Sequence, residues 1–332
     1  MRLIILFVLL TLLISGCDMI TNIIVGKPPT VDVNYNSLHS GVQGISMSFA
    51  PDRPQTNYIV MPNGNDITVI IGMENKGAWD VPAGKGILAL NYDRTYVDFP
   101  DKSKEFSTSE YPLNGRSLIK AKGDKVQVDF NGNILPLKEL KKDITINAVA
   151  CYEYGTEYIF DVCIDTDPTN TRTTPKACDL LQNKKKYNAI GSGQGAPVAI
   201  TSVDQAIRIK DGKLDIDFII KIKNVGNGKI YDIDATPAVL CSGGNSLEAA
   251  DKVTIKVELA DKVLTCEKID NSIDNSKIYV REGLEGIVNC RVTGYSTVND
   301  ESFLSKLKVT LTYDYTDSIG KIIILKKAGA RV

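Results

Sequence analysis

Residues 67–77 (ITVIIGMENKG) and 216–226 (IDFIIKIKNVG) align with each other without a gap. Each stretch is a run of mainly apolar, β-branched residues that ends in Asn-x-Gly. Such a run predicts a core strand, and its glycine predicts a turn through backbone angles that other residues avoid. The recurrence of the pattern indicates that the chain contains a duplicated β unit.

A second pair of stretches supports the duplication, since residues 144–154 (ITINAVACYEY) align with residues 305–315 (SKLKVTLTYDY). Each ends in Tyr-acid-Tyr, which we expect to precede a turn and a final strand. Alternation along a strand places both rings of each motif on one face. We expect one tyrosine hydroxyl to form a hydrogen bond at the edge of a sandwich.

Other parts of the chain are also short runs of β-branched and aromatic residues between turn residues, such as 86–92 (GILALNY) and 125–130 (KVQVDF). Many short strands at this spacing predict an all-β fold of two tandem Ig-like β-sandwich domains. The segments that could hold a helical turn or two are 135–142, 174–186 and 302–307.

At the Asn-x-Gly and Tyr-acid-Tyr motifs the chain resembles Ig-like domains of the CARDB type, which are common in archaeal and bacterial surface proteins. The resemblance covers only part of each unit. It implies a seven-stranded sandwich used for display, spacing or adhesion, without a catalytic site. The first unit is longer than the usual domain of that family.

The chain has 332 residues, which is enough for about two domains with cores of their own. Residues 191–197 (GSGQGAP) have the most flexible composition and form the expected linker. The expected first domain covers residues 34–190, and the second covers residues 198–332.

The N-terminus has the pattern of a secretory signal peptide, with Arg2 followed by an unbroken run of aliphatic, Phe and Thr residues at 3–14. A helix of that length spans roughly 18 Å, well short of a hydrocarbon core of about 30 Å. The segment is therefore expected to be a leader, residues 1–16, and not a membrane anchor.

Residues 14–17 (ISGC) resemble the prokaryotic lipobox, in which the cysteine receives diacylglycerol and becomes the new N-terminus. The resemblance implies lipidation of Cys17, with residues 17–33 as a short tether that contains Pro28 and Pro29. The alternative is an ordinary signal peptide, with Cys17 as a structural thiol. We expect an extracytoplasmic protein, lipid-anchored to the cell membrane at the cell surface or in the periplasm.

Six further cysteines predict disulfide bonds, because an exported chain folds in an oxidising compartment. Cys163 and Cys178 flank one polar loop and are expected to pair; closing such a loop contributes roughly 3 kcal/mol. Cys266 and Cys290, on strands separated by a turn, form the second expected pair. Two cysteines from different expected domains are left, Cys151 and Cys241. Either they join and lock the domains into one rigid body, or they stay free thiols.

Charge and histidine content exclude several function classes. Lys and Arg total 39 against 40 Asp and Glu, so no net positive charge favours nucleic acid. His39 is the only histidine, which excludes Ser-His-Asp or Cys-His catalysis unless His39 itself is the base. We expect no enzymatic activity and no cofactor.

Two groups of residues could either bind a ligand or have a purely structural role. Trp79, Tyr92 and Tyr96 could form an aromatic platform for sugars, although packing against the sandwich is the more common role of such residues.

Asp165, Asp167 and Asn170 could supply oxygens to calcium, or form a solvated turn. They depart from the EF-hand pattern, because Asn170 and Lys176 occupy the positions of its glycine and glutamate. We expect no metal site elsewhere in the chain.

These features favour a non-enzymatic lipoprotein with a structural, adhesive or scaffolding role in the cell envelope, contacting the membrane through its lipid and other envelope proteins through its domains. The alternative is an accessory module that binds a glycan or an ion for a surface complex or transporter.

Overall fold

The computed structural model describes residues 38–110, 112–172, 175–181, 193–243, 247–268, 277–296 and 301–329. The expected signal peptide and tether, with Cys17, lie outside these ranges, as do residues 191–192 of the expected linker. Across the described ranges, no helix has both the length and the apolar character needed to cross a membrane.

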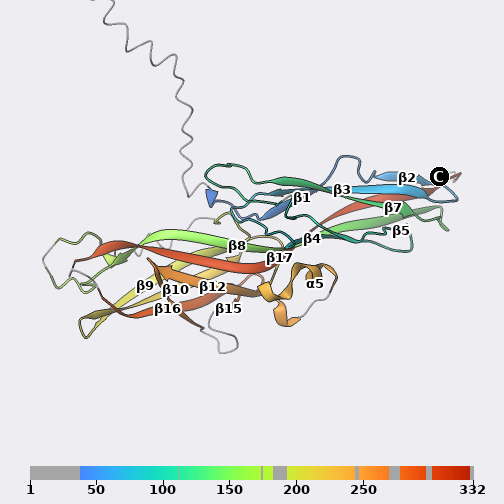
Figure 1. The fold of residues 1–332 in the computed structure, drawn as a ribbon. Coiled ribbons are helices and arrows are strands. Elements are labelled where there is room, and N and C mark those ends of the chain that lie inside the picture. The colour runs from blue at the N-terminus through green and yellow to red at the C-terminus, as the bar shows by residue number, and fades with distance from the viewer. Residues whose placement is uncertain are drawn as a thin grey trace, which may run out of the picture. The chain divides into compact units, whose positions relative to one another are not determined.

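The described residues form mainly β-strands, as predicted for an all-β fold (Figure 1). The first nine strands are β1 (Ile45–Phe49), β2 (Asn57–Val60), β3 (Asn65–Asn75), β4 (Gly86–Asn91), β5 (Val97–Asp98), β6 (Ser103–Glu105), β7 (Lys125–Ile134), β8 (Lys141–Ile164) and β9 (Val198–Lys210). The others are β10 (Lys213–Asn224), β11 (Lys229–Tyr231), β12 (Lys252–Leu259), β13 (Lys262–Val263), β14 (Thr265–Lys268), β15 (Lys277–Tyr279), β16 (Glu285–Tyr295) and β17 (Phe303–Lys327). The helix α5 (Pro237–Cys241) lies between two 3-10 turns, Ile233–Ala235 and Leu247–Ala249.

The strands form three sheets in which nearly all neighbours are antiparallel. One sheet has the order β1-β3-β7-β5, and a second has the order β14-β16-β10-β9. The third has the order β13-β12-β17-β8-β4-β6, with β11, β15 and β2 paired at its sides. The exception in direction is β2, which runs parallel to the last residues of β17.

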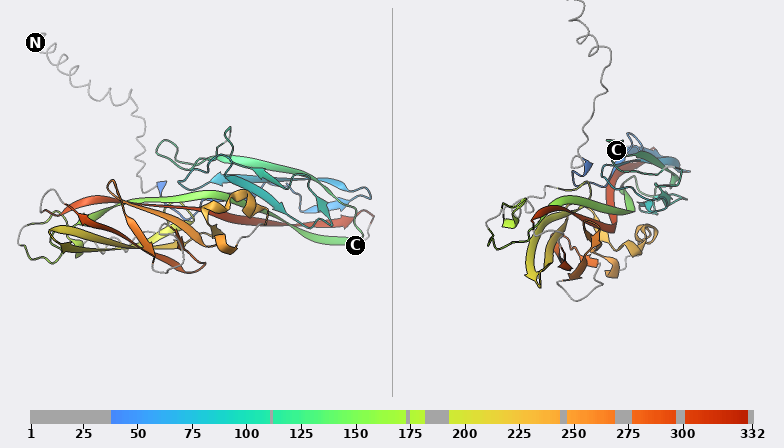
Figure 2. Two further views of the ribbon diagram at one scale, coloured as in Figure 1. Left: turned by 60° about the horizontal axis from the view of Figure 1, so that its bottom comes forward. Right: turned by 60° about the vertical axis from the view of Figure 1, so that its left-hand side comes forward.

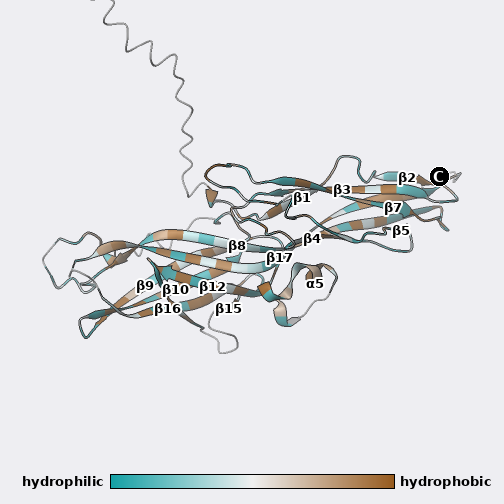
Figure 3. Ribbon diagram, viewed as in Figure 1, coloured by the Kyte–Doolittle hydropathy of each residue, from teal (hydrophilic) through white to brown (hydrophobic). Residues whose placement is uncertain are grey.

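Alternating burial explains why these segments are strands. In β3 every second residue from Ile67 to Asn75 is buried, and the residues between them are partly exposed. The same alternation of apolar and polar residues is visible along β8, β10 and β17 (Figure 3). Side chains on successive strand residues point to opposite faces, so this pattern covers one face with the core and leaves the other toward water.

The antiparallel pair of β8 and β17 runs through both halves of the fold (Figure 2). The first half contains β1 to β7, and the second half contains β9 to β16. Glu153 lies opposite Asp314, and the same register continues on either side of this pair over the full length of β8. The expected turn after Tyr154 is therefore wrong, because β8 continues without a break to Ile164. The expected helical turn at 302–307 is also wrong, since this segment begins β17.

Each long strand contributes to both halves of the fold. The last residues of β17 pair with the first residues of β8 and, through Ile324, with Asn57 of β2. The first residues of β17 pair with the last residues of β8 and with β12. Buried residues of both halves belong to one continuous core cluster.

Residues 35–332 form one compact unit. The division into domains 34–190 and 198–332 stays a prediction, and the described part of the expected linker is not exposed. Residues 194–197 are buried, and the side chain of Gln194 exchanges hydrogen bonds with the backbone of Ile200. The glycines here permit close backbone contact, as in the 2.9 Å hydrogen bond from Gly195 N to Gly41 O.

Candidate functional site

Four buried tyrosines pack together where the middle of β8 pairs with the middle of β17. We call them the tyrosine centre: Tyr152, Tyr154, Tyr313 and Tyr315. Ring centroids lie 5.6 Å apart for Tyr152 and Tyr154 and 5.9 Å apart for Tyr152 and Tyr315. Burial raises the pKa of all four hydroxyls, that of Tyr315 to about 12. The hydroxyls therefore stay protonated and serve as hydrogen-bonding groups.

The centre is pseudo-symmetric, because Tyr154 lies opposite Tyr313 and Tyr152 lies opposite Tyr315. A two-fold rotation about the Glu153–Asp314 pair would exchange the two repeats and keep the same pairing of β8 with β17. The duplication inferred from the sequence thus places equivalent tyrosines around a local two-fold axis.

In the first repeat, the Tyr-acid-Tyr motif meets the Asn-x-Gly motif. Tyr154 Oη donates a 2.9 Å hydrogen bond to Asn75 Oδ1, which also accepts from Gly77 N. A Cβ atom on Gly77 would lie 1.9 Å from Tyr154 Oη, so the glycine is required by this close approach.

The second repeat forms the same contacts. Tyr315 Oη donates to Asn224 Oδ1 at 3.2 Å, and Gly226 N donates to the same oxygen. The two motifs used to detect the duplication are therefore parts of one structural unit. The predicted tyrosine hydrogen bond is present in both copies, but it is formed by buried tyrosines of the core and not at the edge of a sandwich.

The other tyrosine of each motif binds the start of a strand. Tyr152 Oη accepts a hydrogen bond from Ile45 N at 3.3 Å, and Tyr313 Oη accepts one from Val198 N at 3.4 Å. These contacts make β1 and β9 equivalent strands of the two repeats.

The two sides of the centre differ in what covers them. On the first side, Thr156 Oγ1 donates to Val198 O at 2.6 Å, and Ala78 N donates to Gly195 O at 2.9 Å. The chain's own backbone therefore closes this side.

On the second side, the residue equivalent to Thr156 is Asp317, and a pocket of about 220 Å³ lies beside it. Val42 and Asn227 line this pocket, and within the described residues no hydrogen bond joins Asn227 N to Val42 O. Partial burial raises the pKa of Asp317, and the backbone N–H of Ser318 lowers it. We call this hollow the Tyr315 pocket.

Glu153 and Asp314, at the two-fold axis, lie on the face of the strands opposite the tyrosines. Asp314 is fully buried, and neither of its carboxylate oxygens has a hydrogen-bond partner. Burial, the largest cause, and the neighbouring Glu153 carboxylate raise the pKa of Asp314, while Lys85 lowers it, and the net result is a pKa of about 7. Lys85 pairs with Glu153 at 3.1 Å.

All six described cysteines are paired. Cys163 bonds to Cys178, and Cys266 bonds to Cys290 directly opposite it on the neighbouring strand, as predicted. Of the two alternatives for Cys151, the structure forms the bond to Cys241, which ties β8 to α5.

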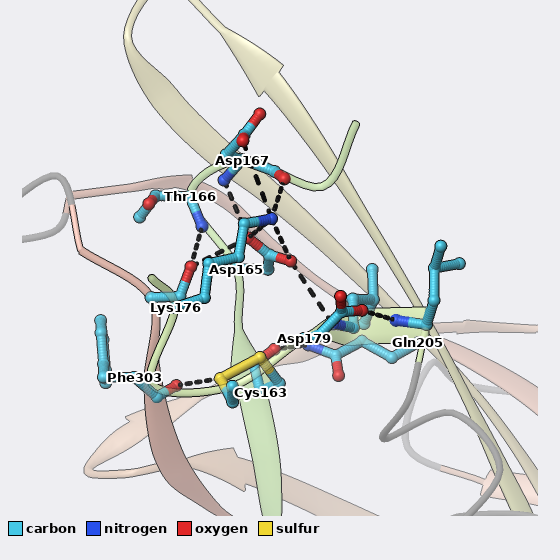
Figure 4. Close-up of a disulfide and its surroundings, with 12 residues drawn as sticks. Cys163, Asp165, Thr166, Asp167, Lys176, Asp179, Gln205 and Phe303 are labelled. Carbon is cyan, nitrogen blue, oxygen red and sulfur yellow. Dashed lines mark hydrogen bonds and ion pairs between the residues drawn. A yellow bond between two sulfur atoms is a disulfide. The ribbon is translucent and has the colours of Figure 1, made fainter. Parts of the chain in front are cut away.

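Asp165 and Asp167 do come together, but around the amino group of Lys176 (Figure 4), and Asn170 accepts a hydrogen bond from the same amino group. Lys176 Nζ lies 3.0 Å from Asp165 Oδ1 and 2.6 Å from Asn170 Oδ1, and it also donates to Asp167 O. Hydrogen bonds, foremost from the backbone of Arg172, lower the pKa of Asp167 to about 2. The Lys176 ammonium thus occupies the position that calcium would need.

The three aromatic residues considered for sugar binding do not form one platform. Trp79 lies against Gly155 of β8, where a Cβ would come within 2.6 Å of the indole ring. Tyr92 packs edge-on against Phe99, with ring centroids 5.0 Å apart. Tyr96 is buried, and its hydroxyl donates to Glu139.

Tyr92 also lines an open, polar recess of about 380 Å³. Asp143 and Asn147 of β8 also line it.

Sequence reasoning missed the buried Asp314 and the Tyr315 pocket. A signal for the pocket was present, because aligning the two Tyr-acid-Tyr motifs places Asp317 over Thr156. The signal for Asp314 was weaker, since an acidic residue between two tyrosines is equally compatible with an exposed face.

Comparison with known proteins does not identify a family. No family model matches the chain, and no curated protein matches it. Among solved structures, the secreted serine protease VesC from Vibrio cholerae is 12% identical with a TM-score of 0.19. The match covers 81% of this chain and 50% of that one, so this chain spans about half the length of the protease chain.

Two other solved structures are similarly distant. A DUF4466 family protein from Parabacteroides merdae is 12% identical over 81% of this chain and 99% of that chain, with a TM-score of 0.15. The partial N-terminal region of an enterococcal surface protein is 8% identical over 89% and 92%, with a TM-score of 0.16. These values are too low to transfer a function.

Proposed function

We propose that the chain is an extracytoplasmic lipoprotein, anchored to the cell membrane through Cys17, with a structural, adhesive or scaffolding role in the envelope. The observation that carries the proposal is the set of three disulfides within one compact all-β unit. Disulfides of this kind persist in oxidising compartments and are rare in the cytosol of mesophiles.

The arrangement of the bonds supports a mechanical role. Cys151–Cys241 joins residues 90 positions apart, and the pair of β8 and β17 holds the two repeats together over its whole length. A body cross-linked in this way keeps its shape while it holds a partner at a distance from the membrane. The lipobox-like ISGC motif would supply the attachment, since two or more acyl chains anchor a protein stably.

The anchor is tested by expressing the full chain in a bacterial host that is fed an alkyne-tagged fatty acid. We expect label on the protein and recovery in the membrane fraction for the wild type. Ser15→Ala keeps a small residue in the motif and is expected to behave like the wild type, whereas Cys17→Ser is expected to lose both label and membrane association. A Cys17→Ser protein that stays labelled and membrane-bound would contradict the proposal.

The structural role is tested by cross-linking the native envelope and identifying neighbours by mass spectrometry. Specific envelope proteins cross-linked to the described unit support scaffolding or adhesion. Cross-links to lipid and to abundant proteins alone would oppose this role.

A second candidate, an accessory module that binds a glycan, is favoured by one observation, the polar recess that Tyr92 lines. Saturation-transfer NMR with a panel of oligosaccharides tests it. Signal that disappears in Asn91→Ala, on the exposed rim of the recess, would support this function, and no transfer from any sugar would remove it.

A further inference from the structure

The Tyr315 pocket is the place where the pseudo-symmetry of the tyrosine centre breaks. Its counterpart on the other side is closed by the hydrogen bond from Ala78 N to Gly195 O and by the Thr156 hydroxyl. At the Tyr315 pocket, among the residues that the structure describes, no hydrogen bond joins Asn227 N to Val42 O, and a carboxylate replaces the threonine hydroxyl. Equivalent backbone positions thus surround a pocket on the second side, whereas on the first side they are joined by these hydrogen bonds.

The charge that lines the pocket is negative only. Asp317 is the only charged residue that lines it, and it is partly withdrawn from water. Its one described hydrogen bond comes from the neighbouring Ser318 N at 2.8 Å. A partly desolvated carboxylate without a cationic partner favours a positively charged ligand and disfavours an anion.

The rest of the lining suits the stem of an organic cation. Met47, Pro197 and Ile319 provide apolar surface, and Tyr152 and Tyr315 provide aromatic surface. Cations are attracted to aromatic rings, and methylene groups pack on apolar side chains while the charged end meets a carboxylate.

Size narrows the class further. The volume of about 220 Å³ is below the roughly 300–1,000 Å³ of pockets that hold drug-sized ligands. It fits one aliphatic chain ending in a charged group. Metal ions are disfavoured, since the described residues contain no group of three acidic, cysteine or histidine side chains that could hold one.

We infer that the Tyr315 pocket binds a primary alkylammonium group, held by Asp317 and packed against Met47 and Ile319. The proposal goes beyond the structural role and does not depend on it. Two sources share this chemistry, a free amine and a basic side chain of a partner protein, and the experiment distinguishes them.

The test uses the full chain in detergent with ¹³C-labelled methionine and isoleucine methyl groups. Met47 and Ile319 report on the pocket, and the exposed Met61 serves as an internal control away from it. The probes are n-butylammonium, a lysine capped at both ends, and n-butanol as the neutral analogue. We expect saturable shifts of Met47 and Ile319, but not of Met61, with the charged probes alone.

The outcome of the two charged probes identifies the source. Binding of n-butylammonium without the capped lysine assigns the pocket to free amines. Binding of the capped lysine shows that the backbone of a partner can approach closely enough to insert its side chain.

Two variants change the pocket by different routes. Asp317→Asn removes the charge with little change in volume and should weaken binding at least about tenfold, the effect of losing roughly one ion pair. Asn227→Phe fills the pocket from its exposed rim, keeps the carboxylate, and should also abolish binding. Asp66→Asn, an exposed substitution on β3, is the matched control and should bind like the wild type.

Folding of each variant is checked from the methyl spectrum outside the pocket. The inference is overturned if neither charged probe shifts Met47 and Ile319, if n-butanol binds as well as n-butylammonium, or if Asp317→Asn retains wild-type affinity.

Discussion

The two sides of the tyrosine centre have the same tyrosine hydrogen bonds but differ in whether backbone covers them. Each side has a tyrosine hydroxyl bound to the asparagine of an Asn-x-Gly turn, and each has a second tyrosine bound to the start of a strand. On one side the backbone at Gly195 closes over the centre, and on the other side the Tyr315 pocket stays open. The two repeats therefore share the contacts that hold the fold, and they differ at the position held by Thr156 in one and by Asp317 in the other.

The comparison also shows how the two repeats depend on each other. Neither repeat completes its own sheet, because the last residues of β8 and β17 each pair within the other half. The shared strands place the tyrosine centre inside one continuous core and not at a hinge. Mutations that disrupt the pairing of β8 with β17 should therefore have larger effects than mutations on one side of the tyrosine centre.

The largest effect is expected from removing residues 319–332. The first half would lose the strand that pairs with the start of β8 and with β2, together with the buried Ile323 and Leu325. Burial of two such side chains contributes about 3–6 kcal/mol, comparable with the whole stability of many domains. We expect the truncated chain to lose much of its β-sheet signal in circular dichroism.

The control for this truncation lacks residues 330–332 alone and should keep the wild-type spectrum. A first half that remains folded without residues 319–332 would show that the exchange of strand ends is not needed.

The next effect concerns Asp314 at the two-fold axis. Its folded-state pKa of about 7 lies above the ordinary aspartate value of 3.8, so the folded protein binds this proton more tightly than the unfolded chain does. Its contribution to stability is therefore complete at low pH and falls as pH rises from about 4 through 7, by at most about 4 kcal/mol. Asp314→Asn mimics the neutral form and should remove this fall.

The measurement is urea unfolding at several pH values, taken as the difference between wild type and Asp314→Asn. Other groups act in the opposite direction; Asp167, with a pKa of about 2, loses its contribution as pH falls toward that value. Taking the difference cancels them. A difference that does not change between pH 4 and 8 would contradict the buried, unpaired state of Asp314.

The smallest effect compares equivalent glycines on the two sides. A Cβ on Gly77 would lie 1.9 Å from Tyr154 Oη and 2.3 Å from Gly195 O, both of which are held in place. A Cβ on Gly226 would lie 2.4 Å from Tyr315 Oη, next to the open pocket, so that side has more room to adjust. We expect Gly77→Ala to cost about 3 kcal/mol and Gly226→Ala about 1–2 kcal/mol.

Chemical denaturation of both variants measures the difference. Gly72→Ala, where the nearest atom would be Ser48 Oγ at 3.4 Å, serves as the tolerated control. Equal losses at Gly77 and Gly226 would show that the two sides are equally rigid.

The β class, the duplication and its two motifs could be predicted from the sequence, because each rests on local patterns of apolar, turn and aromatic residues. The pairing of Cys163 with Cys178 followed from their place around one loop. Cys151 and Cys241 could be matched only by elimination, since no local pattern indicates that α5 packs on β8.

The errors arose where tertiary contacts outweigh local preference. Gly155 suggested a turn, but its lack of a side chain makes room for the Trp79 ring within a continuous strand. The linker at 191–197 stays a prediction; its described residues 194–197 are buried, and the backbone at Gly195 closes one side of the tyrosine centre. For Asp165, Asp167 and Asn170 the sequence left calcium and a solvated turn as alternatives, and it does not show that Lys176 folds back among their oxygens.

The central claim is that the two repeats form one body joined by β8 and β17. Equilibrium unfolding tests it most directly, with Trp79 fluorescence reporting on the first half and far-ultraviolet circular dichroism reporting on all strands. One body predicts that both signals change in a single transition at the same denaturant concentration. Two separate transitions, with Trp79 changing at a different denaturant concentration from the remaining β-sheet, would contradict it.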